Sequence, residues 1–278
     1  MELSIIIAHY DPGNHPSCIE SFHKTLNQIE SQKGDYEIEI IIADDGSATH
    51  QDIQSIGSII SDPDERTIYQ LKGNILSNWK RENHFDYSSI SHWLYLPKIE
   101  PIMSKAQIGN AAIAKTSSDN LFFLDDDNYF ISENTIDTMI KLLQKYHLVI
   151  GQIQDNNGRL RPYSSNRVQG TTFGIIKHHI VNAGLFGVWT EKVSCGIDSD
   201  LWWKLYHYFQ KYHHLQACYT SDIQTLDSCS KRWKTHIKTF FRNYALKKLF
   251  EERNGCSNYR SINTNPSRRK SNWIIDLT

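Results

Sequence analysis

Short runs of apolar residues, many of them β-branched, recur along the chain and predict buried strands. The first run, LSIIIA at residues 3–8, is followed by polar residues within two positions. It predicts a strand buried on both faces rather than a signal peptide, because no basic segment precedes it. Further runs of this kind predict strands at residues 37–43, 66–71, 120–124 and 147–153.

Between these runs, apolar residues are spaced three or four apart, which is typical of helices with one buried face. Ile19, Phe22, Leu26 and Ile29 show this spacing, and Gly34 follows them as a stop signal. The same spacing predicts helices at residues 15–32, 51–60, 102–116, 132–146, 198–212 and 231–250. Two stretches, 72–100 and 155–190, show less regular spacing and are predicted to be mostly loops, the second with a strand or two.

Alternating strands and helices predict an α/β domain with a mostly parallel sheet flanked by helices. The length of 278 residues fits one such domain with a C-terminal extension. We place the catalytic or binding domain at 1–227 and a basic helical extension at 228–278. No apolar run reaches the ~18 residues that a membrane span requires.

Carboxylates follow three of the predicted strands directly. Tyr10-Asp11 comes after the first strand, Asp44-Asp45 after the second, and Asp125-Asp126-Asp127 after NLFFL. Because the carboxyl ends of parallel strands share one edge, these acids are expected to converge on one crevice. Their mutual repulsion favours a bound cation, and oxygen ligands favour Mg²⁺ or Mn²⁺, whose coordination is commonly completed by phosphates.

Taken together, these segments resemble the family 2 glycosyltransferases of the GT-A fold. The matching segments are SIIIAHYDPG at 4–13, IIADDGSATH at 41–50, IGNAA at 108–112 and LFFLDDD at 121–127. The resemblance covers roughly residues 1 to 205 and implies a Rossmann-like GT-A domain. It divides 1–227 into a nucleotide-sugar-binding half, 1–130, and an acceptor-binding half, 131–227.

The resemblance also implies roles by position. Tyr10 and Asp11 would lie near the nucleotide base, Asp44 would hydrogen-bond the base, and Asp45 would support its loop. Asp125 and Asp126 would approach the ribose and the metal, and Asp127 would bind the metal together with Asp125. The family often has Arg at the position of Gly109, so Lys105 or Lys72 would supply that charge. The implied donor-binding set is Ala8, Tyr10, Asp11, Asp44, Asp45, Lys105, Asn110, Asp125 and Asp126.

An inverting transfer also requires a base that removes the acceptor's hydroxyl proton. The segment CGIDSDLWW at 195–203 resembles the family's Glu-Asp motif at a helix N-terminus, with Ile197 in place of the Glu. Asp198 is the candidate base and Asp200 the second choice, although Asp198 could simply cap the helix. The family's metal-binding His has no evident counterpart in SDIQTLDSCS, where Asp222 or Asp227 could replace it.

Aromatic residues suggest an acceptor site. Trp189 precedes the candidate base in a Gly-rich stretch, and Trp202 follows it, so either could stack on a sugar; core packing is the alternative for both. The pairs His178-His179 and His213-His214 are not predicted to bind metal, because adjacent residues do not share a helical face. Cys229 to Trp233 contains Arg-Trp without the Gln of processive synthases, so processive synthesis is not supported.

Charge is distributed unevenly. Residues 228–278 contain twelve Lys or Arg against three acids, a net charge of +9, and the first 227 residues carry −10. The predicted helix 231–250 has basic edges that would suit either an anionic membrane surface or docking on the catalytic domain. The acidic remainder argues against nucleic-acid binding. The five scattered cysteines favour a reducing cytoplasm, and a peripheral position at the inner face of the membrane is compatible with the basic helix.

The sequence therefore predicts an inverting, metal-dependent glycosyltransferase that uses a nucleotide sugar, most simply a UDP-sugar. The acceptor would be a glycan or lipid-linked glycan of a bacterial surface polysaccharide such as an O-antigen or capsule. Two alternatives stay open: a HAD-type phosphatase, disfavoured by Tyr129 four residues after Asp125, and a non-catalytic domain that binds a nucleotide sugar or glycan.

Overall fold

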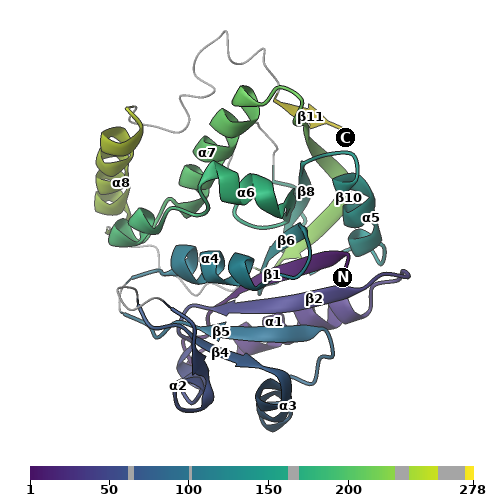
Figure 1. The fold of residues 1–278 in the computed structure, drawn as a ribbon, viewed down its shortest axis with the longest axis vertical. Helices are drawn as coiled ribbons and strands as arrows, with labels where there is room; N and C mark the ends of the chain where they lie inside the picture. Colours follow the sequence, from purple (N-terminus) through teal and green to yellow (C-terminus); the bar gives the residue numbers. More distant parts are fainter. Residues whose placement is uncertain (62–65, 100–101, 162–168, 229–237, 256–272) are drawn as a thin grey trace.

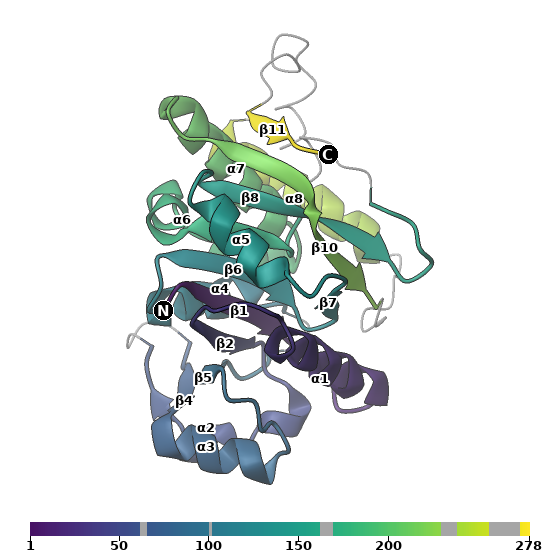
Figure 2. The same ribbon diagram turned by 90° about the vertical axis from the view of Figure 1, so that its right-hand side faces the viewer.

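The computed structural model describes residues 1–61, 66–99, 102–161, 169–228, 238–255 and 273–278. In these residues one sheet of eleven strands forms the centre of the molecule, in the order β11-β10-β8-β9-β6-β1-β2-β5-β4-β3, with β7 paired to β10 (Figure 2). The strands are β1 (Leu3–His9), β2 (Ile38–Asp44), β3 (Ser58–Ile59), β4 (Tyr69–Lys72), β5 (Ile90–Tyr95), β6 (Asn120–Asp125), β7 (Asn128–Phe130), β8 (Leu148–Asp155), β9 (Phe173–Ile176), β10 (Ala217–Asp227) and β11 (Ile274–Asp276).

Most of the sheet is parallel, as predicted. Strands β6, β1, β2 and β5 pair in parallel, and so do β8, β10 and β11. Strand β9 lies antiparallel between β6 and β8, so both parallel groups point the same way. The carboxyl ends of β1, β2, β6, β8 and β10 therefore meet at one edge, which is where ligands bind in open α/β sheets.

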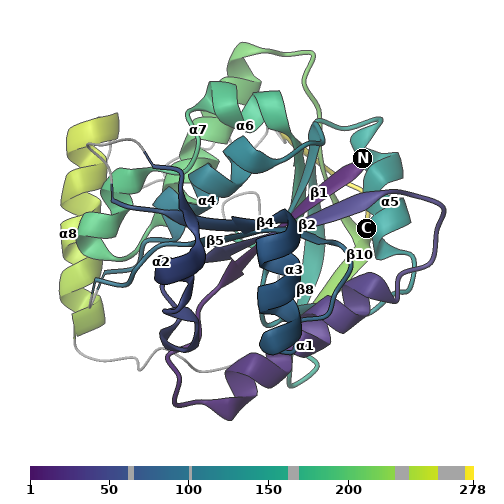
Figure 3. The ribbon, with the colours of Figure 1, turned by 60° about the horizontal axis from the view of Figure 1, so that its bottom comes forward.

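Helices cover both faces of the sheet (Figures 1 and 3). Residues of α1, α2, α3 and α5 pack on one face, and residues of α4, α6 and α7 pack on the other. The helices are α1 (Pro16–Glu30), η1 (Ala48–His50), α2 (Ile53–Ile56), α3 (Gly73–Glu82), α4 (Lys105–Lys115), α5 (Thr135–Leu143), α6 (Lys177–Ala183), η2 (Val188–Val193), α7 (Ile197–Lys211) and α8 (Lys238–Asn254).

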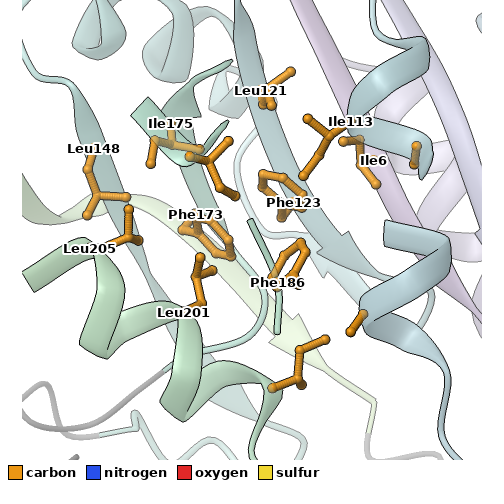
Figure 4. Packing of buried hydrophobic residues seen from close by; sticks show 14 of the residues in the cluster. Ile6, Ile113, Leu121, Phe123, Leu148, Phe173, Ile175, Phe186, Leu201 and Leu205 are labelled. Carbon is orange, nitrogen blue, oxygen red and sulfur yellow. The ribbon is translucent and has the colours of Figure 1, made fainter. Parts of the chain in front are cut away.

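Each apolar run contributes side chains to the hydrophobic cores on both faces of the sheet, because successive strand residues point to opposite sides. Ile5 and Ile7 contribute to the core under α1, whereas Ile6 contributes to the core under α4 and α7. Figure 4 shows this second core, where Phe123 and Phe173 stack with ring centroids 4.7 Å apart. Burial on both faces explains why these strands consist almost entirely of apolar residues.

Three parts of the sequence prediction were wrong or incomplete. The predicted loop at 72–100 contains α3 and β5, and β5 pairs between β2 and β4. The predicted helix at 51–60 shortens to α2, because Gly57 ends it and β3 follows. Strand β10, the longest in the sheet, was not predicted. Strands β5 and β10 mix polar and apolar residues, so their burial depends on neighbours that are distant in sequence.

The C-terminal helix α8 packs against η2 and α7. Phe250 is buried, with its ring 6.2 Å from that of Trp189 and 5.5 Å from that of Trp203. Tyr244, Lys247 and Lys248 are exposed on the same helix. The predicted start of this helix at Lys231 and the Arg232-Trp233 motif lie outside the described residues. Among the described helices, none combines the length and hydrophobicity needed to cross a bilayer.

Candidate active site

A cavity of about 300 Å³ lies at the carboxyl edge of the sheet. Eight of the predicted site residues line it: Ala8, Tyr10, Asp45, Lys105, Asp125, Asp126, Asp127 and Asp198. The structure adds five more lining residues: His9, Ala43, Met103, Ile197 and Asp227. Among the described lining residues, six carboxylates face one lysine. This imbalance fits a site for a divalent cation with oxygen ligands.

The acidic turn after β6 is fixed to the end of β1 by a buried pair. His9 Nδ1 lies 2.6 Å from Asp126 Oδ2, and the backbone N–H of Tyr10 donates to the same oxygen at 3.2 Å. The His9 ring stacks on Phe22 with centroids 4.1 Å apart. Asp126 is buried and one of its oxygens is held by two protein groups, whereas Asp125 and Asp127 are partly exposed and are the better candidates for cation ligands of the triplet.

Lys105 links the acidic turn to the candidate base. Its Nζ forms an ion pair with Asp125. Burial opposes the charge of Lys105, but the carboxylates of Asp125 and Asp198 outweigh this effect and raise its pKa. The pKa of Asp198 is itself raised by burial, with the nearby Asp125 adding to the effect and Lys105 opposing it. A carboxylate with a raised pKa is better suited to accept a proton than an ordinary Asp.

Asp44 and Asp45 are adjacent but have different surroundings. Asp44 is fully buried and accepts hydrogen bonds from the Ser47 N–H at 2.7 Å and Trp93 Nε1 at 3.2 Å. Its other partner is His50 Nδ1, at 2.8 Å; burial opposes ionisation of Asp44, but this hydrogen bond and the charge of His50 hold its pKa below the usual value. Asp44 does not line the cavity, so its position does not fit the predicted contact with the nucleotide base.

Asp45 does line the cavity, with Lys98 2.6 Å and the Ser104 N–H 3.1 Å from its Oδ2. Burial raises the pKa of Asp45 in spite of Lys98. Lys98 Nζ also lies 4.3 Å from the centre of the Tyr10 ring, which holds that ring beside the cavity. Asp45 and Tyr10 therefore present a carboxylate and an aromatic ring to the cavity.

Two comparisons by sequence gave no match, neither to a protein-family model nor to a curated protein. Comparison of the structure with solved structures found matches. TarS of S. aureus in complex with UDP-GlcNAc matches with a TM-score of 0.55 at 13% identity, over 91% of this chain and 66% of that one. The mannosyltransferase PcManGT of Pyrobaculum calidifontis, in complex with GDP-Man and Mn²⁺, matches with a TM-score of 0.50 at 15% identity, over 89% and 61%.

The chain has a GT-A fold. It spans 40% of a longer TarS chain that it matches with a TM-score of 0.54. Within the GT-A fold, the cavity lies where the sequence resemblance placed the donor site, at the ends of β1 and β6.

Some predicted site residues lie away from this cavity. Asp11 lines a second cavity of about 320 Å³, with His15 and His50, and accepts hydrogen bonds from the Gly13 N–H at 2.8 Å and Thr49 Oγ1 at 3.2 Å. Its carboxylate thus shapes the turn after β1. The predicted place of Asp11 beside the base is not supported by this geometry.

Asn110 has a structural partner instead of a donor. Its Nδ2 donates to the Phe186 carbonyl at 2.9 Å, and its Oδ1 accepts from the Phe186 N–H at 3.0 Å. This reciprocal pair ties α4 to the segment before η2 and satisfies two half-buried backbone groups. Both polar atoms of the Asn110 side chain are thus paired with backbone, and Asn110 does not line the cavity.

Asp200 and the two tryptophans are also structural. Asp200 is buried and pairs with Trp189 Nε1 at 2.9 Å and Lys204 Nζ at 2.5 Å. Trp189 lies beneath α8, and Trp202 packs in the core against Phe173. The structure therefore separates Asp200 from Asp198, because residues two apart in a helix point to nearly opposite sides. Trp189 and Trp202, the two predicted acceptor platforms, do not line the cavity.

Asp227 is the site residue that sequence reasoning left undecided. It ends β10 and lines the cavity, whereas Asp222 is exposed in a bulged part of the same strand. The same signal that identified Asp125, an acid at the end of an apolar run, is present in IQTLD, but the run is too mixed to predict a strand alone.

Proposed function

We propose that this protein is an inverting glycosyltransferase that transfers a sugar from a nucleoside diphosphate donor with the help of Mn²⁺ or Mg²⁺. The observation that carries the proposal is the convergence of Asp198 and the Asp125–Asp127 turn on one cavity, linked by Lys105. A UDP-sugar is the simplest donor, by analogy with the UDP-GlcNAc of the TarS complex.

The donor would lie along the ends of β1 and β6. Tyr10 and Asp45 would contact the nucleoside, with Ala8 leaving room for it, and Lys105 would approach the diphosphate. Asp125 and Asp127 would hold the divalent cation, since Asp126 is anchored to His9. When bound, the cation would neutralise the charge that develops on the departing diphosphate.

Asp198 would act as the base. It would remove the proton of the acceptor hydroxyl while that oxygen forms a bond to the anomeric carbon of the sugar. The bond from this carbon to the diphosphate oxygen breaks with its electron pair, so the nucleoside diphosphate leaves and the configuration inverts. The backbone of Gly170 lies directly against the Asp198 carboxylate and would hold it in place.

The acceptor would be a glycan or lipid-linked glycan in the synthesis of a bacterial surface polysaccharide. The exposed Lys247 and Lys248 on α8 are compatible with contact to an anionic membrane surface on the cytoplasmic side. With Trp189 and Trp202 buried, the acceptor would be bound by other residues near the mouth of the cavity.

Calorimetric titration of UDP, GDP, dTDP and CDP, with and without Mn²⁺, tests the proposal. We expect one preferred nucleotide, whose binding Mn²⁺ strengthens in the wild type and in the control Asp137→Ala, a change of a carboxylate on the surface of α5. Asp127→Ala should lose the strengthening by Mn²⁺. Absence of nucleotide binding in the presence of metal would rule the proposal out.

The same preparation separates the alternatives. A transferase would hydrolyse or transfer the sugar of its nucleotide-sugar donor, and Asp198→Asn would stop this without weakening nucleotide binding. A binding domain would bind the donor without turnover in either form. A phosphatase would release inorganic phosphate from simple phosphomonoesters.

A further inference from the structure

Arg161 bridges two carboxylates at the ends of neighbouring strands. Asp155 and Asp227 are the last residues of β8 and β10 and lie opposite each other in the sheet. Arg161 Nε lies 2.7 Å from Asp155 Oδ1, and its Nη2 forms an ion pair with Asp227 Oδ2. The Arg161 N–H donates to the Ile153 carbonyl at 2.9 Å, which fixes the start of this side chain.

Only one of these three side chains belongs to the cavity. Asp227 lines it together with Asp125 and Asp127, whereas Arg161 and Asp155 are not among its lining residues. The backbone holds Asp227 next to the acidic turn: Asp227 is opposite Asn128 in the β7–β10 pair, and the Ser228 N–H donates to the Asp127 carbonyl at 3.0 Å.

Asp227 can therefore be approached from two sides. The guanidinium of Arg161 contacts it from outside the cavity, and a divalent cation held by Asp125 and Asp127 would meet it from within. A carboxylate that ligates Mn²⁺ or Mg²⁺ gives up much of its charge to the ion, which weakens an existing ion pair. The two cations thus compete for one carboxylate.

Asp227 ends β10 beside the acidic turn and is the carboxylate that could replace the family's metal-binding His. The geometry points to Arg161 as the residue that occupies Asp227 until the divalent cation binds. This inference rests on the proposed metal-dependent function. Arg161 is then a positioning residue that lowers the affinity of the site for metal alone. Asp155 keeps the released guanidinium at the rim of the cavity, where its planar array of donors suits a phosphate.

The test is a titration of the full chain with Mn²⁺ alone, in which electron paramagnetic resonance reports the free ion. Asp227→Asn should weaken Mn²⁺ binding at least about tenfold, because it removes a charged ligand of the same shape. Arg161→Gln should strengthen binding by roughly fivefold, the effect expected from removal of a competing, partly exposed ion pair. The double variant should match Asp227→Asn, because Arg161 acts only through Asp227.

Asp155→Asn is the matched control. It removes the same charge from the same ion-pair network but no ligand, so we expect less than about a twofold change in Mn²⁺ affinity. Equal weakening in Asp155→Asn and Asp227→Asn would show a general effect of charge and overturn the inference. So would unchanged or weaker binding in Arg161→Gln.

A second readout follows Arg161 directly. Phenylglyoxal modifies accessible arginines, and peptide mass spectrometry can measure its rate at Arg161. Saturating Mn²⁺ should accelerate modification of Arg161 in the wild type and leave the rate unchanged in Asp227→Asn. Asp127→Ala distinguishes failure of this inference from failure of the proposed metal site. If the metal site itself does not exist, Asp127→Ala leaves Mn²⁺ binding unchanged.

Discussion

His9 Nδ1 lies 2.6 Å from Asp126 Oδ2, and both side chains are almost fully removed from solvent. This contact joins the end of β1 to the turn that carries the other two carboxylates of the triplet. The middle acid of the triplet thus holds the acidic turn in place, and its two neighbours are the partly exposed carboxylates that line the cavity.

Replacement of His9 by Phe should therefore destabilise the fold. Phe would retain the stacking on Phe22 but remove the imidazole partner of the buried Asp126 carboxylate, and breaking a buried pair in this way costs about 3 kcal/mol. Urea denaturation measures the loss. His15→Phe, at an exposed position before α1, should change the free energy of unfolding by less than about 0.5 kcal/mol. A similar small change in His9→Phe would contradict the role given to this pair.

The pH dependence of transfer should report Asp198. Only the ionised carboxylate can accept a proton, and burial raises its pKa, so activity should fall with decreasing pH at a higher pH than for an ordinary Asp. Lys105 opposes that rise. Lys105→Met should therefore move the acidic limb of the kcat profile to still higher pH, and Asp198→Asn should reduce kcat by about 10²-fold or more. An acidic limb that does not move in Lys105→Met would show that Asp198 does not set it.

A methyl group at residue 170 should disturb catalysis without disturbing the fold. The Cβ of an alanine there would overlap the Asp198 carboxylate, while the next residue, Thr171, accepts a hydrogen bond from the Asp125 N–H at 2.8 Å. Gly170→Ala should lower kcat about tenfold or more through misplacement of the base, with nucleotide affinity preserved. Gly109→Ala is the control, because its Cβ would meet only the Phe186 ring at contact distance. Equal kcat values in the two variants would argue against Asp198 as the base.

His179 should make stability depend on pH. Burial, with the nearby His178 and His147, lowers its pKa from 6.5 to about 4, so the folded state resists a proton that the unfolded chain accepts. Above pH 6.5 the residue is neutral in both states and has no effect. As pH falls from 6.5 to 4, the free energy of unfolding should fall by no more than about 3 kcal/mol through this residue.

His179→Phe should flatten that part of the stability profile, and His178→Gln, at an exposed neighbour, should retain most of it. Unfolding by urea at a series of pH values measures both. If the His179→Phe profile keeps the full slope, the slope arises elsewhere.

Local sequence determined much of the donor side of the site. LSIIIA, IEIIIA and NLFFL are apolar enough to be strands in almost any α/β setting, and an acid directly after such a strand lies at the carboxyl edge of the sheet. Asp45, Asp125 and Asp127 could be placed near one crevice for this reason, whereas Lys105 and Asp198 were placed there by the family resemblance of their segments. The order of strands and helices predicted the mostly parallel α/β sheet, and the resemblance of the four motif segments predicted the GT-A fold.

Tertiary structure decided which polar groups are still available to a ligand. Three predicted polar side chains are already hydrogen-bonded within the fold: Asp44 to His50, Asn110 to Phe186, and Asp200 to Trp189. No local sequence pattern predicts these contacts. Burial of Trp189 likewise depends on Phe250, which is 61 residues away in the chain. The mixed strand that ends in Asp227 becomes part of the site only by pairing with β7 and β8, since register between distant segments is set by packing of the whole sheet.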